Sequence, residues 1–177
     1  MPNTDPKDWL TEWKSGDIGF ARSTGVIAKA IRFGERLRGT RNDSKWNHAF
    51  ILNEFVNGEW TIFQAEAKGI TADKTLSSVA PGGTYEIIPL PYEADRNEVL
   101  AFARSQVGAK YGFFTILSCI VDILLPDTIC LRRANTWICS GFVAACLMFG
   151  GWTRAFKIAK IDLYTIMPSE LRAEIAP

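Results

Sequence analysis

The chain has 177 residues and a net charge of +1 at neutral pH, with 47% hydrophobic and 22% charged residues. This length fits one domain of ordinary size, residues 1–177, and is sufficient to bury a sizeable core. The near-zero net charge provides no bulk attraction to nucleic acid or to an anionic membrane. We therefore expect no nucleic-acid partner.

Residues 1–17 contain no apolar segment of the kind found in secretory signal peptides. We expect a cytoplasmic protein, or one delivered without a signal peptide by a phage-type or non-classical route. The longest apolar run, Gly112–Leu125, is too short to span a bilayer and contains Asp122. It is interpreted as a buried or interfacial helix, and peripheral membrane contact through it stays open.

The first half of the chain shows mainly strand patterns. A short strand is predicted over Asp17–Arg22, followed by a helix over Gly25–Leu37. Two apolar-rich strands, 48–55 and 59–67, are joined by Asn57-Gly58, which is a strong hairpin signal.

The second half is predicted to be mostly helical. After a strand-like run over 85–91, Asp95 and Glu98 resemble a capping box for a helix that continues to about Val107. A further helical region is expected from Ala109. This order predicts an α+β fold, with an antiparallel sheet from the first half and helices mostly in the second.

The last helix, predicted from near Ile138 to Phe149, contains two of the four cysteines. Cys139 falls in its first turn, where the partial positive charge and free N–H groups favour a thiolate and can hold a substrate oxyanion. Cys146 lies two turns further along, away from these N–H groups. Cys139 can therefore be a nucleophile, and a buried structural thiol is the alternative interpretation.

His48 is the only histidine, so it has to be the base if Cys139 is a nucleophile. The other two cysteines are Cys119 and Cys130; no C-x-x-C pair occurs, and we expect neither a metal site nor a cofactor. His48 begins a predicted strand directly after a polar loop, a place from which a side chain can point into a cleft. A histidine with a purely structural role on the sheet is the alternative.

Two hairpin registers give His48 different partners. A two-residue turn at Asn57-Gly58 places His48 opposite Ala67, whereas a three-residue loop over 56–58 places it opposite Glu66. The second register also places Phe50 opposite Gln64, and it gathers an all-apolar patch on the other face. That patch comprises Ala49, Ile51, Phe63 and Ala65.

We prefer the second register because it separates core from site. It gives His48 a carboxylate, from Glu66, that fixes the tautomer and stabilises the imidazolium. Gln64 is the alternative orienting group, and Glu66 can also be a solvated strand residue.

Five short segments, in this order along the chain, resemble the circularly permuted NlpC/P60 proteins. They are Gly16–Ile18, Asn47–Leu52, Glu66–Ile70, Ala109–Phe113 and Cys139–Leu147. The branch they most resemble is the YiiX/YebB-like permuted papain-like amidases, with a more distant likeness to the lecithin:retinol acyltransferase group. The histidine segment precedes the cysteine segment, which is the permuted order, and the resemblance covers a core of about 16–150.

The resemblance implies a permuted papain-like fold in which the Cys139 helix packs against the sheet that carries His48. By position, Cys139 matches the nucleophile, His48 the base and Glu66 the polar third member. Tyr111 matches an aromatic or hydroxyl position near the site, and we assign Asp17 to structure near the cleft. The sequence departs from relatives at Ala49, where they often carry a larger aliphatic residue.

Together these features predict a cysteine hydrolase that cleaves amide or peptide bonds through a thioester. The backbone N–H of Cys139 and nearby donors of the helix start, where Ser140 lies, are expected to hold the oxyanion. Peptidoglycan peptides are the first substrate class considered. A lipid acyl hydrolase or acyltransferase, suggested by Gly112–Leu125, and a non-catalytic binding module are the alternatives.

Overall fold

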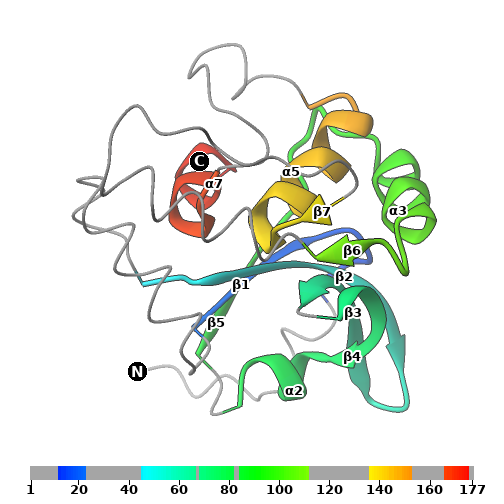
Figure 1. Cartoon of the computed structure of the whole chain (residues 1–177), viewed down its shortest axis with the longest axis vertical. Coiled ribbons are helices and arrows are strands. Elements are labelled where there is room, and N and C mark those ends of the chain that lie inside the picture. Colours follow the sequence, from blue (N-terminus) through cyan, green and yellow to red (C-terminus); the bar gives the residue numbers. More distant parts are fainter. Residues whose placement is uncertain are drawn as a thin grey trace.

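A computed structural model of the chain describes residues 12–22, 45–66, 68–81, 84–111, 136–152 and 166–175. These residues form an α+β fold around a five-stranded antiparallel sheet with the strand order β4-β3-β2-β1-β5 (Figure 1). Its strands are β1 (Ile18–Ala21), β2 (His48–Val56), β3 (Glu59–Glu66), β4 (Gly69–Thr75) and β5 (Tyr85–Ile88). The expected α+β class with an antiparallel sheet from the first half is confirmed.

The helices described are α2 (Leu76–Val79), α3 (Arg96–Ser105), α5 (Cys139–Phe149) and α7 (Pro168–Ile175). Two short strands, β6 (Lys110–Tyr111) and β7 (Thr136–Trp137), pair in parallel beside β4. Figure 1 shows α3, α5 and α7 on one side of the sheet and α2 on the other.

The sheet is apolar on both faces because alternate residues of β2 and β3 pack into different cores. The larger core joins one sheet face to α3, α5 and α7, and it includes the predicted patch of Ala49, Ile51, Phe63 and Ala65. The smaller core lies on the α2 side and includes Phe50, Leu52, Trp60, Ile62 and Leu76. The sheet is therefore a middle layer whose β2 strand contributes to both cores.

Helix α5 begins at Cys139 and ends at Phe149, as the sequence predicts. Its first nine residues are all buried, because it is apolar around its whole circumference and packs between the sheet and two helices. Gly150 ends it and Gly151 takes a positive φ of 92°. A Cβ on Gly150 would lie 2.5 Å from Val99, so only glycine allows this close approach to α3.

The hairpin between β2 and β3 differs from the expected three-residue loop. Asn57 and Gly58 form a two-residue turn with φ of 53° and 82°, and Val56 pairs with Glu59. A register shift between Leu52 and Phe55 then restores the Phe50–Gln64 pairing that was expected. The predicted loop is wrong, but the predicted register near His48 is right because a bulge adds one residue to β2.

Helix α3 agrees with the sequence prediction except in its cap. Asp95 accepts hydrogen bonds from the N–H groups of Asn97 (2.8 Å) and Glu98 (3.1 Å), which is one half of the expected capping box. The Asp95 N–H donates not to Glu98 but to the carbonyl of Gly150, at 2.7 Å. The start of α3 is thereby joined to the end of α5.

The helical region expected from Ala109 is wrong at its start, since Lys110–Tyr111 forms β6. Lys110 and Tyr111 are extended because they pair with Thr136 and Trp137. Strands β4 and β7 and helices α2 and α7 were not predicted, and β5 is shorter than the strand-like run 85–91.

The expected helix over Gly25–Leu37 and the run Gly112–Leu125 lie outside the described residues. Within the described part of the chain, no helix is long and apolar enough to cross a membrane.

Candidate active site

His48 is the first residue of β2, and its side chain is half-buried. Its Nε2 donates to Oε1 of Gln64 at 2.7 Å, and Gln64 is itself buried in β3. The Phe50 ring lies beside the imidazole, with 6.2 Å between ring centroids. The imidazole is thus oriented by an amide on the neighbouring strand, which leaves Nδ1 as the ring nitrogen that Gln64 does not use.

Cys139 is the first residue of α5, and its side chain is buried. Burial alone raises the pKa of this thiol, but the hydrogen bond and positive charge of His48 outweigh it and hold the pKa below its usual value. The backbone N–H groups of Ala49 and Ser140 lower the pKa further. These two donors support a thiolate next to the imidazole.

The pKa of His48 shifts in the complementary direction. Burial lowers it, but the hydrogen bond and charge of Cys139, with smaller contributions from Gln64 and Glu66, raise it above its usual value. The two shifts have the same physical origin: each charged form is stabilised by the other. The directions of the two pKa shifts therefore favour a thiolate–imidazolium pair.

Cys146 provides an internal comparison because it lies in the same helix and is also a free, buried thiol. Burial raises its pKa far above the usual range, and among the described residues no charged neighbour opposes the effect. The expected contrast between the two thiols of α5 is therefore present. Cys119 and Cys130 lie outside the described residues.

Glu66, expected beside His48, is not its hydrogen-bond partner. It is the last residue of β3, pairs with Gly69 of β4 and is half-buried. Its charge contributes the smallest of the effects that raise the pKa of His48. Gln64, the alternative orienting group, makes the contact instead, because two residues along the strand bring its side chain back to the same face as Glu66.

Ser140 directly follows Cys139 in the chain, and the backbone of Tyr111 is brought close to Cys139 by strand pairing. The Ser140 hydroxyl is fully buried and donates to the carbonyl of Ile166 at 2.5 Å. The backbone of Tyr111 pairs with Trp137, two residues before Cys139. The structure thus brings both residues to the start of α5, Ser140 with a defined partner and Tyr111 through its backbone position.

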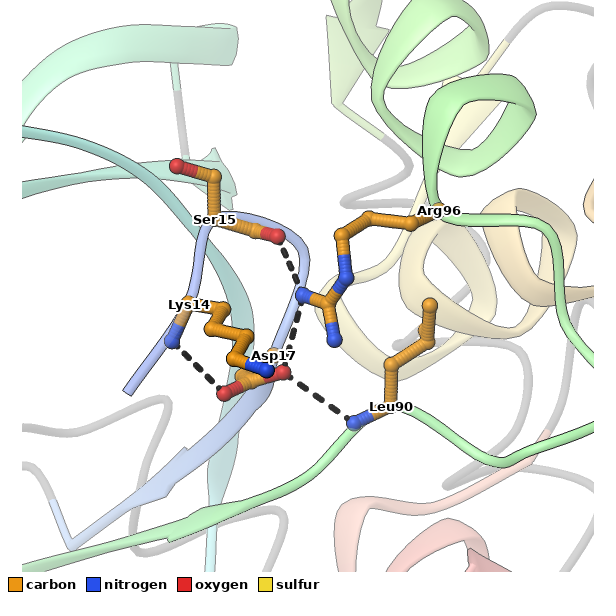
Figure 2. Close-up of polar contacts among 5 residues, drawn as sticks. All are labelled: Lys14, Ser15, Asp17, Leu90 and Arg96. Atoms are coloured by element: carbon orange, nitrogen blue, oxygen red, sulfur yellow. Dashed lines mark hydrogen bonds and ion pairs between the residues drawn. The ribbon is translucent and has the colours of Figure 1, made fainter. Parts of the chain in front are cut away.

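Asp17 lies in a buried polar network between β1, α3 and the segment after β5 (Figure 2). Its carboxylate accepts from Nη1 of Arg96 (2.9 Å), the N–H of Leu90 (3.2 Å) and the N–H of Lys14 (2.9 Å). The same guanidinium also donates to the carbonyl of Ser15. Asp17 therefore joins elements, in keeping with its expected structural assignment.

Sequence reasoning missed Ser169, whose buried hydroxyl donates to the carbonyl of Trp46 at 3.3 Å. Trp46 stands two residues before His48, so α7 contacts the segment that leads into β2. A signal was present in the sequence. Pro168 at the first helical position with Glu170 two residues later is typical of a helix start.

No protein-family model and no curated protein matches this chain. Among the described residues, no cluster of three or more His, Cys, Asp or Glu side chains could hold a metal ion. What the site offers chemically is a buried thiol at a helix start, an imidazole that stabilises its thiolate, and an amide that orients the imidazole. Such an arrangement can carry out nucleophilic acyl transfer.

Proposed function

We propose that this protein is a cysteine hydrolase that cleaves amide or peptide bonds, with Cys139 as nucleophile, His48 as base and Gln64 as the orienting group. The observation that carries the proposal is the mutual stabilisation of the Cys139 thiolate and the His48 imidazolium. Structural thiols in an apolar core, such as Cys146, have the opposite pKa shift.

The proposed fold family is the permuted papain-like one of the NlpC/P60 proteins. Three features support it: the histidine strand precedes the cysteine helix in the chain, the sheet is antiparallel, and the helix begins at the cysteine and packs on that sheet. Gln64 takes the place that the resemblance gave to Glu66, which acts only through its charge.

In the first half of the reaction, the Cys139 proton already rests on the His48 imidazole, and the Sγ thiolate attacks the substrate carbonyl carbon. The N–H groups in the first turn of α5 stabilise the oxyanion. The carbon–nitrogen bond breaks, and the leaving amine takes the proton from His48. A thioester on Cys139 remains.

In the second half, His48 removes a proton from a water molecule that attacks the thioester. The carbon–sulfur bond breaks, the carboxylic acid leaves, and the proton stays on His48, which restores the thiolate–imidazolium pair. Gln64 holds the imidazole through both halves, because its carbonyl accepts from Nε2 in the neutral and in the protonated form. Each step uses groups of this chain and water alone.

The proposal is tested with two substrate classes, muropeptides and fatty-acyl esters, and with the variants C139A, H48A and C146A. Amide hydrolysis predicts muropeptide cleavage that C139A and H48A abolish and that C146A retains. Preferential cleavage of the acyl esters would instead identify the lipid acyl hydrolase or acyltransferase suggested by Gly112–Leu125. If neither class is cleaved and Cys139 alkylates no faster than a free model thiol, the protein is a binding module and the proposal is wrong.

A further inference from the structure

The two groups of the proposed dyad belong to different elements, and something has to fix these elements relative to each other. Helix α5 contacts β2 through apolar side chains such as Phe142 and Val143 in the larger core. Apolar contacts are not directional, so they resist separation better than they resist a small slide of the helix along the sheet. The hydrogen bonds that Cys139 makes with His48 and with the Ala49 N–H join the starts of α5 and β2 directly, and further directional contacts there would limit the remaining slide.

One short segment, Ile166–Ser169, makes a directional contact with α5 and another with Trp46, two residues before β2 begins. At one end, the carbonyl of Ile166 accepts from Ser140, the residue directly after Cys139 (2.5 Å). At the other end, the Ser169 hydroxyl donates to the carbonyl of Trp46 (3.3 Å), close to His48. All four residues of the segment are buried, so water does not compete for these hydrogen bonds.

The Ile166–Ser169 segment is restrained by Pro168 and by contacts that the following residues of α7 make. Pro168 fixes the backbone at the first position of α7, and the Met167 N–H donates to Oε2 of Glu170 at 2.8 Å. Leu171 is fully buried in the larger core, and Arg172 forms two hydrogen bonds with Glu86 of β5, at 2.9 and 3.1 Å. Movement of α7 would have to break these contacts together.

We infer that Ile166–Ser169 is a positioning bridge that sets the distance between the Cys139 thiol and the His48 imidazole, with Ser140 and Ser169 as positioning residues. The inference rests on the proposed function, and neither serine hydroxyl takes part in the chemistry itself. A displacement of about 1 Å between reacting groups can cost on the order of 100-fold in rate. Loss of either hydroxyl should therefore lower activity much more than it lowers stability.

The test compares S140A, S169A and the conservative S169T with the wild type in the full chain. The readouts are the pH profile of iodoacetamide alkylation at Cys139, located by peptide mass spectrometry, and the denaturant midpoint of unfolding. S105A is the matched control, since its hydroxyl also donates to a backbone carbonyl, that of Phe102 at 2.7 Å, but on an exposed helix end. If the bridge positions the two groups, S140A and S169A should move the pH profile of Cys139 alkylation to higher pH. The alkylation rate near neutral pH should then fall by at least about tenfold. S169T should restore the profile, and S105A should leave it unchanged.

The outcomes separate the inference from the function on which it rests. If the wild-type Cys139 reacts as an ordinary thiol, the proposed function fails and the bridge with it. If the wild-type thiol is activated and S169A has the wild-type profile, only the bridge is wrong. S169A decides the matter by itself if S140A does not fold, because Ser169 lies outside α5. A shift in the unfolding midpoint without a change in the profile would show a structural role only and would also overturn the inference.

Discussion

Oε1 of Gln64 accepts a hydrogen bond from Nε2 of His48 at 2.7 Å, so an amide, and not a carboxylate, orients the imidazole. An amide fixes the ring and its tautomer without adding a negative charge. The charge that stabilises the imidazolium therefore comes mainly from the Cys139 thiolate, and Glu66 adds a smaller effect. This arrangement couples the protonation of His48 closely to that of Cys139.

Replacement of Gln64 by alanine is expected to lower kcat/KM by about 10- to 100-fold, because the imidazole loses the group that orients it. Q64E should keep the hydrogen bond and raise the pKa of His48 further, since a carboxylate adds an opposite charge. The matched control is E66Q, for which we expect a loss of at most about fivefold, the equivalent of ~1 kcal/mol for a partly exposed charge. If E66Q lowers kcat/KM more than Q64A does, Glu66 and not Gln64 is the group that orients His48.

The H48A variant is expected to move the reactivity of Cys139 to higher pH. In the wild type, His48 lowers the pKa of the thiol against the effect of burial. Without the imidazole, burial is opposed only by backbone N–H groups, so the pKa of Cys139 rises and less thiolate exists at neutral pH. We expect the alkylation rate near pH 7 to fall by about tenfold or more, in proportion to the thiolate fraction. Site-resolved alkylation kinetics from about pH 5 to 10 measure this.

The activity of the wild type should follow a bell-shaped pH profile. As the pH falls through the lowered pKa of Cys139, the thiolate is protonated and the acid limb appears. As the pH rises through the raised pKa of His48, the proton needed by the leaving amine is lost. The alkaline limb should therefore lie above about pH 6.5, the usual value for histidine. An alkaline limb below that value would contradict the direction of the His48 shift.

The sequence was sufficient where one local pattern determines one element. The apolar run that starts at Cys139 and ends at two glycines predicted α5, and Asp95 predicted the start of α3. His48 was predicted as the candidate base by elimination, because the sequence contains no second histidine. The opposite chemical environments of Cys139 and Cys146 followed from their positions in one helix.

Other features depend on contacts that sequence periodicity does not encode. The bulge in β2 is stabilised by the Thr61 hydroxyl, which bonds Asn53 and both backbone groups of Glu54 at 3.1 to 3.2 Å. Beyond the bulge, the two strands are in the register in which Gln64 reaches His48, although the turn itself takes the other register. Strand β6 likewise exists through its pairing with β7, and no pattern within its two residues predicts it.

The Asp17 network is expected to serve stability and not chemistry. D17A removes the acceptor of the Arg96 guanidinium and of the Leu90 and Lys14 N–H groups, and we expect a loss of about 2–4 kcal/mol in the free energy of unfolding. The alkylation rate of Cys139 in the folded variant should stay at the wild-type value. The control is E54Q, which breaks an ion pair with Arg104 in which both side chains are more than half exposed. Its cost should be below ~1 kcal/mol, and an equal cost for both variants would argue against the network.

Gly19 is expected to be irreplaceable because the Phe50 ring lies against its backbone. A Cβ at Gly19 would sit 2.0 Å from Cε2 of Phe50, and this ring is fully buried and beside His48. Since neither β1 nor the ring can retreat without disturbing a core, G19A should cost about 3 kcal/mol or more. Chemical denaturation measures the loss.

The double variant G19A/F50L separates steric conflict from the loss of backbone freedom. Leucine removes the ring atoms that collide with the new methyl group, so the double variant should be more stable than the sum of the two single effects, with a coupling of about 1–3 kcal/mol. G58A is the matched control for an open glycine, since no described residue lies within 4 Å of its Cβ position and only its positive φ of 82° is strained. It should cost about 1 kcal/mol. Additive effects in the double variant would mean that the ring moves aside, and that contact with Phe50 is not the cause of the loss in G19A.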